Sequence, residues 1–179
     1  VRQSLDRNLK VTAFVRDAKR LEHDVDYIEG DALNYDDVAK AVKGKDIIIS
    51  ALGIKPGKKA ALPDMISNIT EAMKEHGVDK LIFESAYGAS PKDKGAYART
   101  LHMVIPRKMK AKKVSERTIK DSGLKFLIVR PTSLTDGPLT KDYEVTQVKR
   151  GVRPTISRAD VAHFMLESLE EEGFRTITH

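Results

Sequence analysis

Short apolar runs alternate with amphipathic stretches along the whole chain. The runs are rich in β-branched and aromatic side chains and stop at charged or glycine-containing turns, which is typical of strands. The run at 46–51 is apolar on consecutive positions, as in a strand that is buried on both faces. The predicted strands are residues 10–15, 26–29, 46–51, 80–83, 124–130 and 175–178.

The stretches between these runs carry apolar residues at helical spacing. Asn34 and Ser157 are predicted N-caps, and Asp160 completes a capping box with Ser157. Residues 88–104 show no clear pattern, and residues 1–5 read as the tail of a helix. The predicted helices lie between Asn34 and Gly44, over 63–76, over about 107–121, and between Ser157 and Gly173.

This order of elements predicts an α/β fold. Alternating strands and helices form a parallel sheet that is covered on both faces, and right-handed crossovers make it doubly wound. The length of 179 residues favours one domain, residues 1–179. Ligands of such sheets bind at the carboxyl ends of the strands. The loops of interest therefore follow Val15, Glu29, Ala51, Phe83 and Val129.

Composition narrows the chemistry. The chain has no cysteine, which excludes disulfides, thiolate zinc sites and cysteine nucleophiles. Its five histidines lack metal-ligand spacing, so we expect no metal. No apolar run approaches the length of a membrane span, and no secretory signal is visible, so we expect a cytoplasmic protein with no membrane partner. The net charge of +6 favours anionic ligands such as a nucleotide cofactor.

Two basic motifs weakly suggest other functions, a P-loop and a nucleic-acid-binding surface. Residues 53–58 resemble a P-loop, but the motif is one residue short, and Lys59 replaces the Ser or Thr that binds magnesium. Five of the seven residues in 107–113 are basic. No aromatic residue interleaves with them, so we interpret this run as a solvated helix face and expect no nucleic-acid partner.

Several short segments together carry a resemblance to a known family. They are Val11–Asp17, Gly30–Ala32, Ala51–Gly53, Ala72–Lys80, Ser85–Tyr87, Ser122–Lys125, Arg130–Pro131, Asp136–Thr140 and Ile156–Ala162. In order and spacing they resemble the atypical short-chain dehydrogenase/reductases, a family with an NAD(P)H-binding Rossmann domain. Within it the chain looks most similar to the flavin reductase and biliverdin reductase B type.

Two hallmarks of that family do not occur in these 179 residues. One is the Gly-rich loop that brings backbone amides to the cofactor pyrophosphate. The resemblance places this loop and its strand before Val1, so that the first strand would be missing from the middle of the sheet, between strands 10–15 and 46–51. The other is a tyrosine with a lysine four residues later, which the atypical subfamily often lacks.

The resemblance implies NADPH as the cofactor. Arg16 ends a strand where an arginine suits a ribose 2′-phosphate; the alternative is a solvated arginine at a strand end. Asp31 and Ala32 would approach the adenine edge, although a turn aspartate is an equal alternative at Asp31. The cofactor backbone would pass small residues after the third strand. These are Ala51, Leu52 and Gly53, although a glycine also suits a simple strand-to-loop transition.

The resemblance also implies contacts to the nicotinamide end of the cofactor, made by residues that follow two later strands. Ser85 would lie beside the nicotinamide as the catalytic residue, with its hydroxyl bonded to the carboxamide or to the substrate; the alternative is a serine that caps a strand end. Pro131, Thr132 and Ser133 would border the carboxamide, although Pro131 alone also suits a strand stop.

The function implied is an NADPH-dependent reductase that transfers a hydride to a flat conjugated small molecule, of the flavin or linear tetrapyrrole type. The chain shows no strong general acid. Two alternatives stay open: a non-catalytic NAD(P)-sensing regulator similar to the NmrA-like proteins, and an N-terminally truncated, inactive fragment. We expect a monomer or small homo-oligomer.

Overall fold

A computed structural model of the chain describes residues 1–54, 61–91, 93, 95–146 and 153–178. The largest sheet has five strands in the order β3-β4-β5-β9-β7. The first four run parallel and β7 is antiparallel to β9. The strands are β3 (Ile47–Ser50), β4 (Lys80–Glu84), β5 (Lys125–Pro131), β9 (Gly173–Thr178) and β7 (Glu144–Thr146).

Two smaller sheets accompany it. β1 (Thr12–Val15) pairs in parallel with β2 (Asp26–Glu29), and β6 (Ser133–Thr135) pairs in parallel with β8 (Thr155–Ser157). Among the described residues, β1 and β3 belong to different sheets and do not pair with each other. The sheet is therefore divided at the position where the resemblance places a missing strand.

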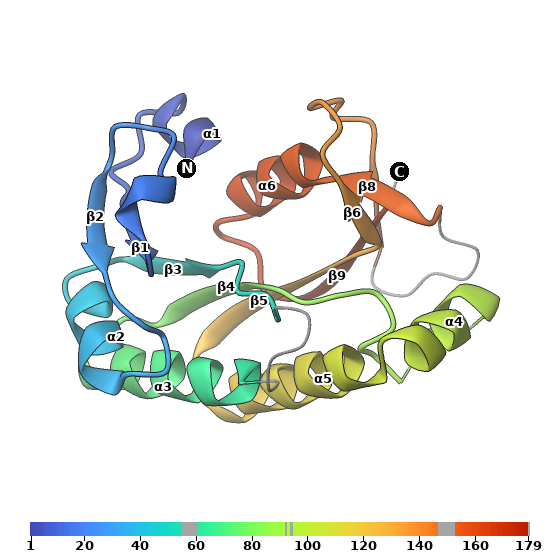
Figure 1. Cartoon of the computed structure of the whole chain (residues 1–179), viewed down its shortest axis with the longest axis horizontal. Helices are drawn as coiled ribbons and strands as arrows, with labels where there is room; N and C mark the ends of the chain where they lie inside the picture. Colours follow the sequence, from blue (N-terminus) through green and yellow to red (C-terminus); the bar gives the residue numbers. More distant parts are fainter. Residues whose placement is uncertain (55–60, 92, 94, 147–152, 179) are drawn as a thin grey trace.

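Helices cover both sides of the five-stranded sheet. In Figure 1, α3 and α5 lie side by side along one face and α6 lies on the other, while α2 lies beside α3 next to the two-stranded sheet. The helices are α1 (Arg2–Leu5), the short 3-10 helix η1 (Ala18–Arg20), α2 (Tyr35–Val42), α3 (Leu62–Glu75), α4 (Ala96–Val104), α5 (Pro106–Asp121) and α6 (Arg158–Glu167).

The core has two parts, one on each face of the sheet. Leu81 and Ile128 pack with Ile66 and Ile119 of the helices α3 and α5. Their neighbours on the same strands, such as Ile82, pack toward α6. Because successive residues of a strand point to opposite faces, both faces of β4 and β5 are buried. The doubly wound parallel arrangement predicted from the sequence is confirmed.

Helix caps are confirmed where side chains supply them. Asn34 Oδ1 accepts a hydrogen bond from Asp36 N at 2.9 Å, and Ser157 Oγ accepts one from Asp160 N at the same distance. The end predicted for the last helix was wrong. α6 stops at Glu167, and Gly173 instead begins β9 with a φ of 96°.

Residues 88–104 are not wholly irregular, because α4 occupies the second half of this segment. Gly95 precedes α4 without a side-chain cap, and Ile105 and Pro106 separate it from α5. Neither end of α4 therefore has a capping residue that would distinguish a helix end from a loop in the sequence. Met103 and Val104 are exposed on α4, so the pattern of apolar residues does not mark one buried face.

Candidate functional site

The carboxyl ends of β3, β4 and β5 meet at one edge of the five-stranded sheet. Residues 51–53 follow β3, Ser85 follows β4, and Pro131 is the last residue of β5. Ser85 N donates to Val129 O at 2.7 Å, so the ladder between β4 and β5 continues as far as this serine. The parallel register thus brings together seven of the ten residues that the sequence analysis selected. They are Ala51, Leu52, Gly53, Ser85, Pro131, Thr132 and Ser133.

A buried ion pair lies directly behind Ser85. Arg130 donates to Glu116 twice, from Nε to Oε1 at 2.9 Å and from Nη2 to Oε2 at 2.6 Å. Ser85 Oγ donates its proton to Glu116 Oε1 as well. The hydroxyl proton of Ser85 is thereby committed to the carboxylate, so toward a ligand this oxygen presents lone pairs and acts as an acceptor.

Lys112 extends from α5 to the same edge. Its Nζ donates to the carbonyl oxygens of Glu84 and, at 3.3 Å, of Leu52, which lie at the ends of β4 and β3. The ammonium group also lies 4.8 Å from the centre of the Phe83 ring. Only 8% of Lys112 is exposed, so a positive charge is held at the point where these two strands end.

The surroundings shift the ionisation of Lys112. Burial lowers its pKa to about 8, because the charged form loses hydration, while Glu84 and Glu116 oppose part of this shift. Burial also raises the pKa of Glu84, and the charge of Lys112 opposes that shift. Lys112 is therefore mostly charged at neutral pH but titrates just above it.

Lys112 and Glu116 are the site residues that sequence reasoning missed. The run 107–113 was interpreted as one solvated face, which is wrong for Lys112. A signal was present in the helical spacing. The buried residues of α5 include Met109, Lys112, Glu116 and Ile119, at intervals of three and four. This row places the lysine and the glutamate on the face that carries the core residues.

Arg16, Asp31 and Ala32 lie at the carboxyl ends of β1 and β2, in the two-stranded sheet. Arg16 is exposed. Ala32 is buried in the same core cluster that Leu52 packs against, and its carbonyl accepts a hydrogen bond from Asn68 Nδ2 of α3 at 3.0 Å. Through α3, the turn that carries Ala32 is tied to the larger sheet.

Asp31 has a structural part in its own turn. Its Oδ1 accepts a hydrogen bond from Leu33 N at 3.0 Å, and its backbone N–H donates to Asp37 Oδ2 at 3.1 Å. These bonds match the turn aspartate that the sequence analysis kept as an alternative.

Tyr97 connects α4 to the residues after β5. Its hydroxyl lies 2.7 Å from Ser133 Oγ, accepts from Ser133 N at 3.1 Å, and donates to Pro154 O at 2.9 Å. Its ring is stacked on Tyr87 with centroids 5.7 Å apart. Thr132 and Pro131 are buried, so of these three predicted residues only Ser133 presents an exposed side chain beside α4.

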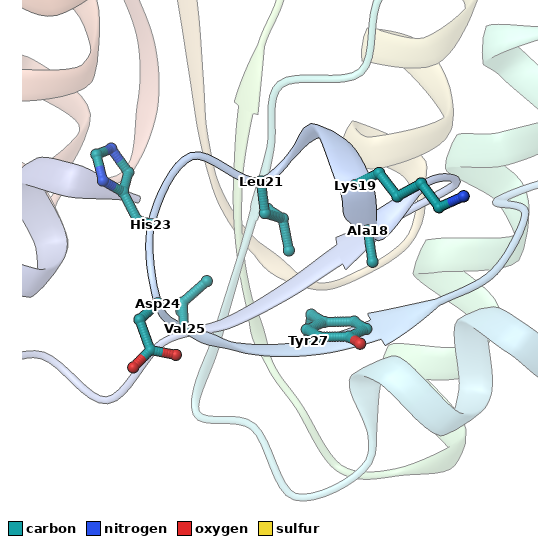
Figure 2. A pocket seen from close by; sticks show the side chains of 7 residues that line it. All are labelled: Ala18, Lys19, Leu21, His23, Asp24, Val25 and Tyr27. Carbon is teal, nitrogen blue, oxygen red and sulfur yellow. The ribbon is translucent and has the colours of Figure 1, made fainter.

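A separate pocket of about 330 Å³ lies beside β2. Figure 2 shows Tyr27 and Leu21 facing each other across it, with Lys19 of η1 extending away. None of the predicted site residues lines this pocket. It is therefore distinct from the edge of the five-stranded sheet where the buried polar groups gather.

Three other features that the sequence analysis considered add no residues to this site. No group of three or more potential metal ligands occurs among the described residues, and no helix in that part of the chain has the length and apolar character of a membrane span. Most of the segment that resembles a P-loop lies outside the described residues.

The fold and the polar edge define the class of NAD(P)-binding Rossmann-fold proteins. The family model described as NAD(P)H-binding matches residues 1–172. The chain belongs to this family. A curated relative is "Uncharacterized protein At2g34460, chloroplastic" from Arabidopsis thaliana, which is 26% identical over 195 residues, covering 99% of this chain and 70% of that protein.

Solved structures show the same fold. A short-chain dehydrogenase/reductase from Veillonella parvula DSM 2008 in complex with NADP has a TM-score of 0.83, with 18% identity over 99% of this chain and 87% of the other. ChuY from Escherichia coli O157:H7, described as an anaerobillin reductase, has a TM-score of 0.82, with 20% identity over 99% of this chain and 88% of the other. The predicted family resemblance is confirmed.

The residues of this chain fit part of a nicotinamide cofactor. A buried ammonium group, Lys112, and an oriented acceptor, Ser85, stand at the strand ends, and an exposed guanidinium, Arg16, ends β1. A Cβ added at Gly53 would meet nothing within 4 Å, so the backbone there is open to approach. The Gly-rich amides that bind a pyrophosphate are not among the 179 residues.

Proposed function

We propose that this protein is an NADPH-dependent reductase that transfers a hydride to a flat conjugated acceptor of the flavin or linear tetrapyrrole type. The observation that carries the proposal is the cluster of Lys112, Ser85 and the Glu116–Arg130 pair at the carboxyl ends of β3, β4 and β5. Membership of the NAD(P)H-binding family and the similarity in fold to ChuY, described as an anaerobillin reductase, support it.

Arg16 selects the cofactor in this proposal. Its exposed guanidinium at the end of β1 pairs with a 2′-phosphate, which NADH lacks. Asp31 and Ala32 border the adenine, and residues 51–53 leave room for the cofactor backbone. Lys112 holds positive charge next to the phosphates or the ribose hydroxyls on the nicotinamide side.

Ser85 orients the nicotinamide rather than donating a proton to the substrate. Because its own proton is bound by Glu116, Ser85 Oγ accepts an N–H of the carboxamide. Pro131, Thr132 and Ser133 border the same group. When bound, NADPH supplies a hydride from C4 of its nicotinamide, and a proton from solvent completes the reduction of the acceptor.

An equilibrium titration with NADPH and NADH tests the cofactor assignment. The emission of the reduced nicotinamide serves as the readout, since the chain contains no tryptophan. We expect micromolar binding of NADPH and much weaker binding of NADH. Arg16→Ala weakens NADPH binding by about tenfold to a hundredfold and leaves NADH binding unchanged. Arg117→Ala, an exposed arginine on α5, is the matched control. Absence of binding by either nucleotide would overturn the proposal.

One observation fits a second function as well, a sensor that binds NAD(P) without turnover. Lys112 is preceded four residues earlier by Lys108 rather than by a tyrosine, so no phenol stands next to the buried ammonium in the helix. NADPH oxidation measured with FMN or dichlorophenolindophenol separates the two functions. Turnover supports the reductase, whereas tight binding without turnover supports the sensor.

A further inference from the structure

The net positive charge of the chain is concentrated in one segment. Residues 95–115, which include α4 and the first half of α5, contain six basic residues and no acidic residue. One of the six, Lys112, is buried at the site already described. The other five are at least partly accessible, and none has an ion-pair partner among the described residues. They are Arg99, Arg107, Lys108, Lys110 and Lys113.

On α5 these cations share one face. Arg107, Lys110 and Lys113 follow one another at intervals of three, which keeps them on the side opposite the buried row of Lys112 and Glu116. Farther along, Arg117 pairs with Asp121 at 3.4 Å. Figure 1 shows that α4 continues from the N-terminal end of α5 at the edge of the molecule.

Apolar side chains stand exposed beside these cations. Met103 is 81% exposed and Val104 is 69% exposed, at the last turn of α4. Val104 is three residues before Arg107, so the two lie within about 11 Å along the chain. On α5 itself, Val114 is 41% exposed next to Lys113. We call Arg99, Met103, Val104, Arg107, Lys110, Lys113 and Val114 the α4–α5 surface.

We propose that the α4–α5 surface binds reversibly to a bilayer that contains anionic lipid. Cationic side chains are attracted to anionic headgroups, and exposed aliphatic side chains gain from burial in the interface. Neither contribution is strong alone, but an apolar contact next to a basic patch provides two signals together. The expectation of no membrane partner rested on the absence of a span, and the α4–α5 surface revises it for a peripheral contact.

The same features argue against nucleic acid as the partner. Met103 and Val104 gain nothing from a phosphate backbone. The one aromatic residue of the segment 95–115, Tyr97, is stacked on Tyr87 and has its hydroxyl bonded to Ser133 and Pro154. Its ring is therefore engaged within the protein, whereas single-strand binding needs open stacking platforms.

Co-sedimentation of the full chain with vesicles tests this proposal, and it does not depend on reductase activity. We expect binding to vesicles of phosphatidylcholine mixed with phosphatidylglycerol, and none to vesicles of phosphatidylcholine alone. Binding falls steeply when salt is raised to about 0.5 M, because exposed charges are then screened. Equal binding to both kinds of vesicle, or none to either, would overturn the proposal.

Two double variants separate the contributions. Lys110→Gln with Lys113→Gln lowers vesicle affinity by at least about tenfold, and Met103→Ser with Val104→Ser lowers it while leaving the charge unchanged. The matched control, Lys40→Gln with Lys43→Gln, removes the same charge from exposed positions at α2 and leaves affinity nearly unchanged. Circular dichroism confirms that each variant is folded. Tight binding of a short oligonucleotide that Met103→Ser with Val104→Ser does not affect would instead identify nucleic acid as the partner.

Discussion

At the scale of single residues, one buried carboxylate organises the loop that leads into β7. Asp160 accepts hydrogen bonds from Thr140 N and Lys141 N, each at 2.8 Å, and from Thr140 Oγ1 at 2.9 Å. Lys141 has a φ of 61°, a left-handed conformation that costs free energy for a residue with a side chain. The carboxylate thus holds the loop in a conformation that the loop does not favour alone.

We expect Asp160→Asn to lower the free energy of unfolding by about 1–3 kcal/mol, because an amide cannot accept all of these bonds. Burial favours the neutral form of Asp160, but hydrogen bonds from Ser157, Lys141 and Thr140 outweigh it and lower the pKa of the carboxyl. The stability that its charge supplies is thus present above about pH 4 and is lost as pH falls through the lowered pKa. Urea unfolding at several pH values measures this. Asp136→Asn, at an exposed ion pair with Arg158, is the control.

Lys112 gives a pH prediction for the site. Below its pKa of about 8 the ammonium attracts the anionic cofactor, and above it the neutral amine does not. We therefore expect the affinity for NADPH to change little between about pH 6.5 and 7 and to fall as the pH rises through about 8. Lys112→Met binds more weakly and without this pH dependence. Titrations of NADPH across pH measure the effect, with exposed Lys113→Met as control. An unchanged profile in Lys112→Met would contradict the assignment.

At the scale of elements, the turn between β2 and α2 depends on a close approach. A Cβ added at Gly30 would lie 2.8 Å from Asp37 Cβ and 2.8 Å from Phe14 Cε2. Gly30 N also donates to Val15 O at 2.9 Å, which keeps the turn against the end of β1. Because Gly30 has no side chain, Asp37 of α2 and the ring of Phe14 can both pack against its backbone. This close packing positions the turn that contains Asp31.

Gly30→Ala should destabilise the protein by about 1–3 kcal/mol, since neither the α2 backbone nor the Phe14 ring can move far within the packed turn. Thermal or urea unfolding provides the measurement. Gly53→Ala is the matched comparison, because a Cβ there meets nothing within 4 Å and its φ is not left-handed. Equal losses in the two variants would show that steric contact at Gly30 is not the cause.

At the scale of the whole molecule, the proposed site draws on two separate sheets. Arg16 and Asp31 end strands of the β1–β2 sheet, whereas Ser85 and Lys112 lie at the edge of the five-stranded sheet. Contacts between α2 and α3 and the bond from Asn68 to Ala32 join the two parts. A cofactor that contacts both ends would add a further link between the sheets.

Amide hydrogen exchange tests this link. We expect saturating NADPH to slow exchange both at 16–20 and at 50–53 and 85–87, because ligand binding suppresses local opening where contacts form. The C-terminal end of α5, residues 117–121, serves as an internal reference and keeps its exchange rate. Protection confined to one of the two sheets would contradict a ligand that bridges them.

Local sequence was sufficient for the elements that carry their own signals. Asn34 and Ser157 cap helices through bonds within three residues, and the apolar runs at 46–51 and 124–130 predict the strands that the structure shows as β3 and β5. The expectation that 46–51 is buried on both faces was wrong, because β3 lies at the end of the five-stranded sheet, where Ile49 is 43% exposed. The strand-end rule then placed Ser85 and residues 51–53 at one edge. These are consequences of backbone geometry and periodicity, which neighbouring residues determine.

Other features depended on packing between distant segments. The uncapped α4, the pairing of β9 between β5 and β7, and the burial of Lys112 all depend on contacts far apart in sequence. The sequence by itself determined the class of fold and the loops that hold the site. Only the tertiary structure decided that Glu116 takes the proton of Ser85 and that Lys112 turns inward, because burial and partner choice depend on which surfaces meet.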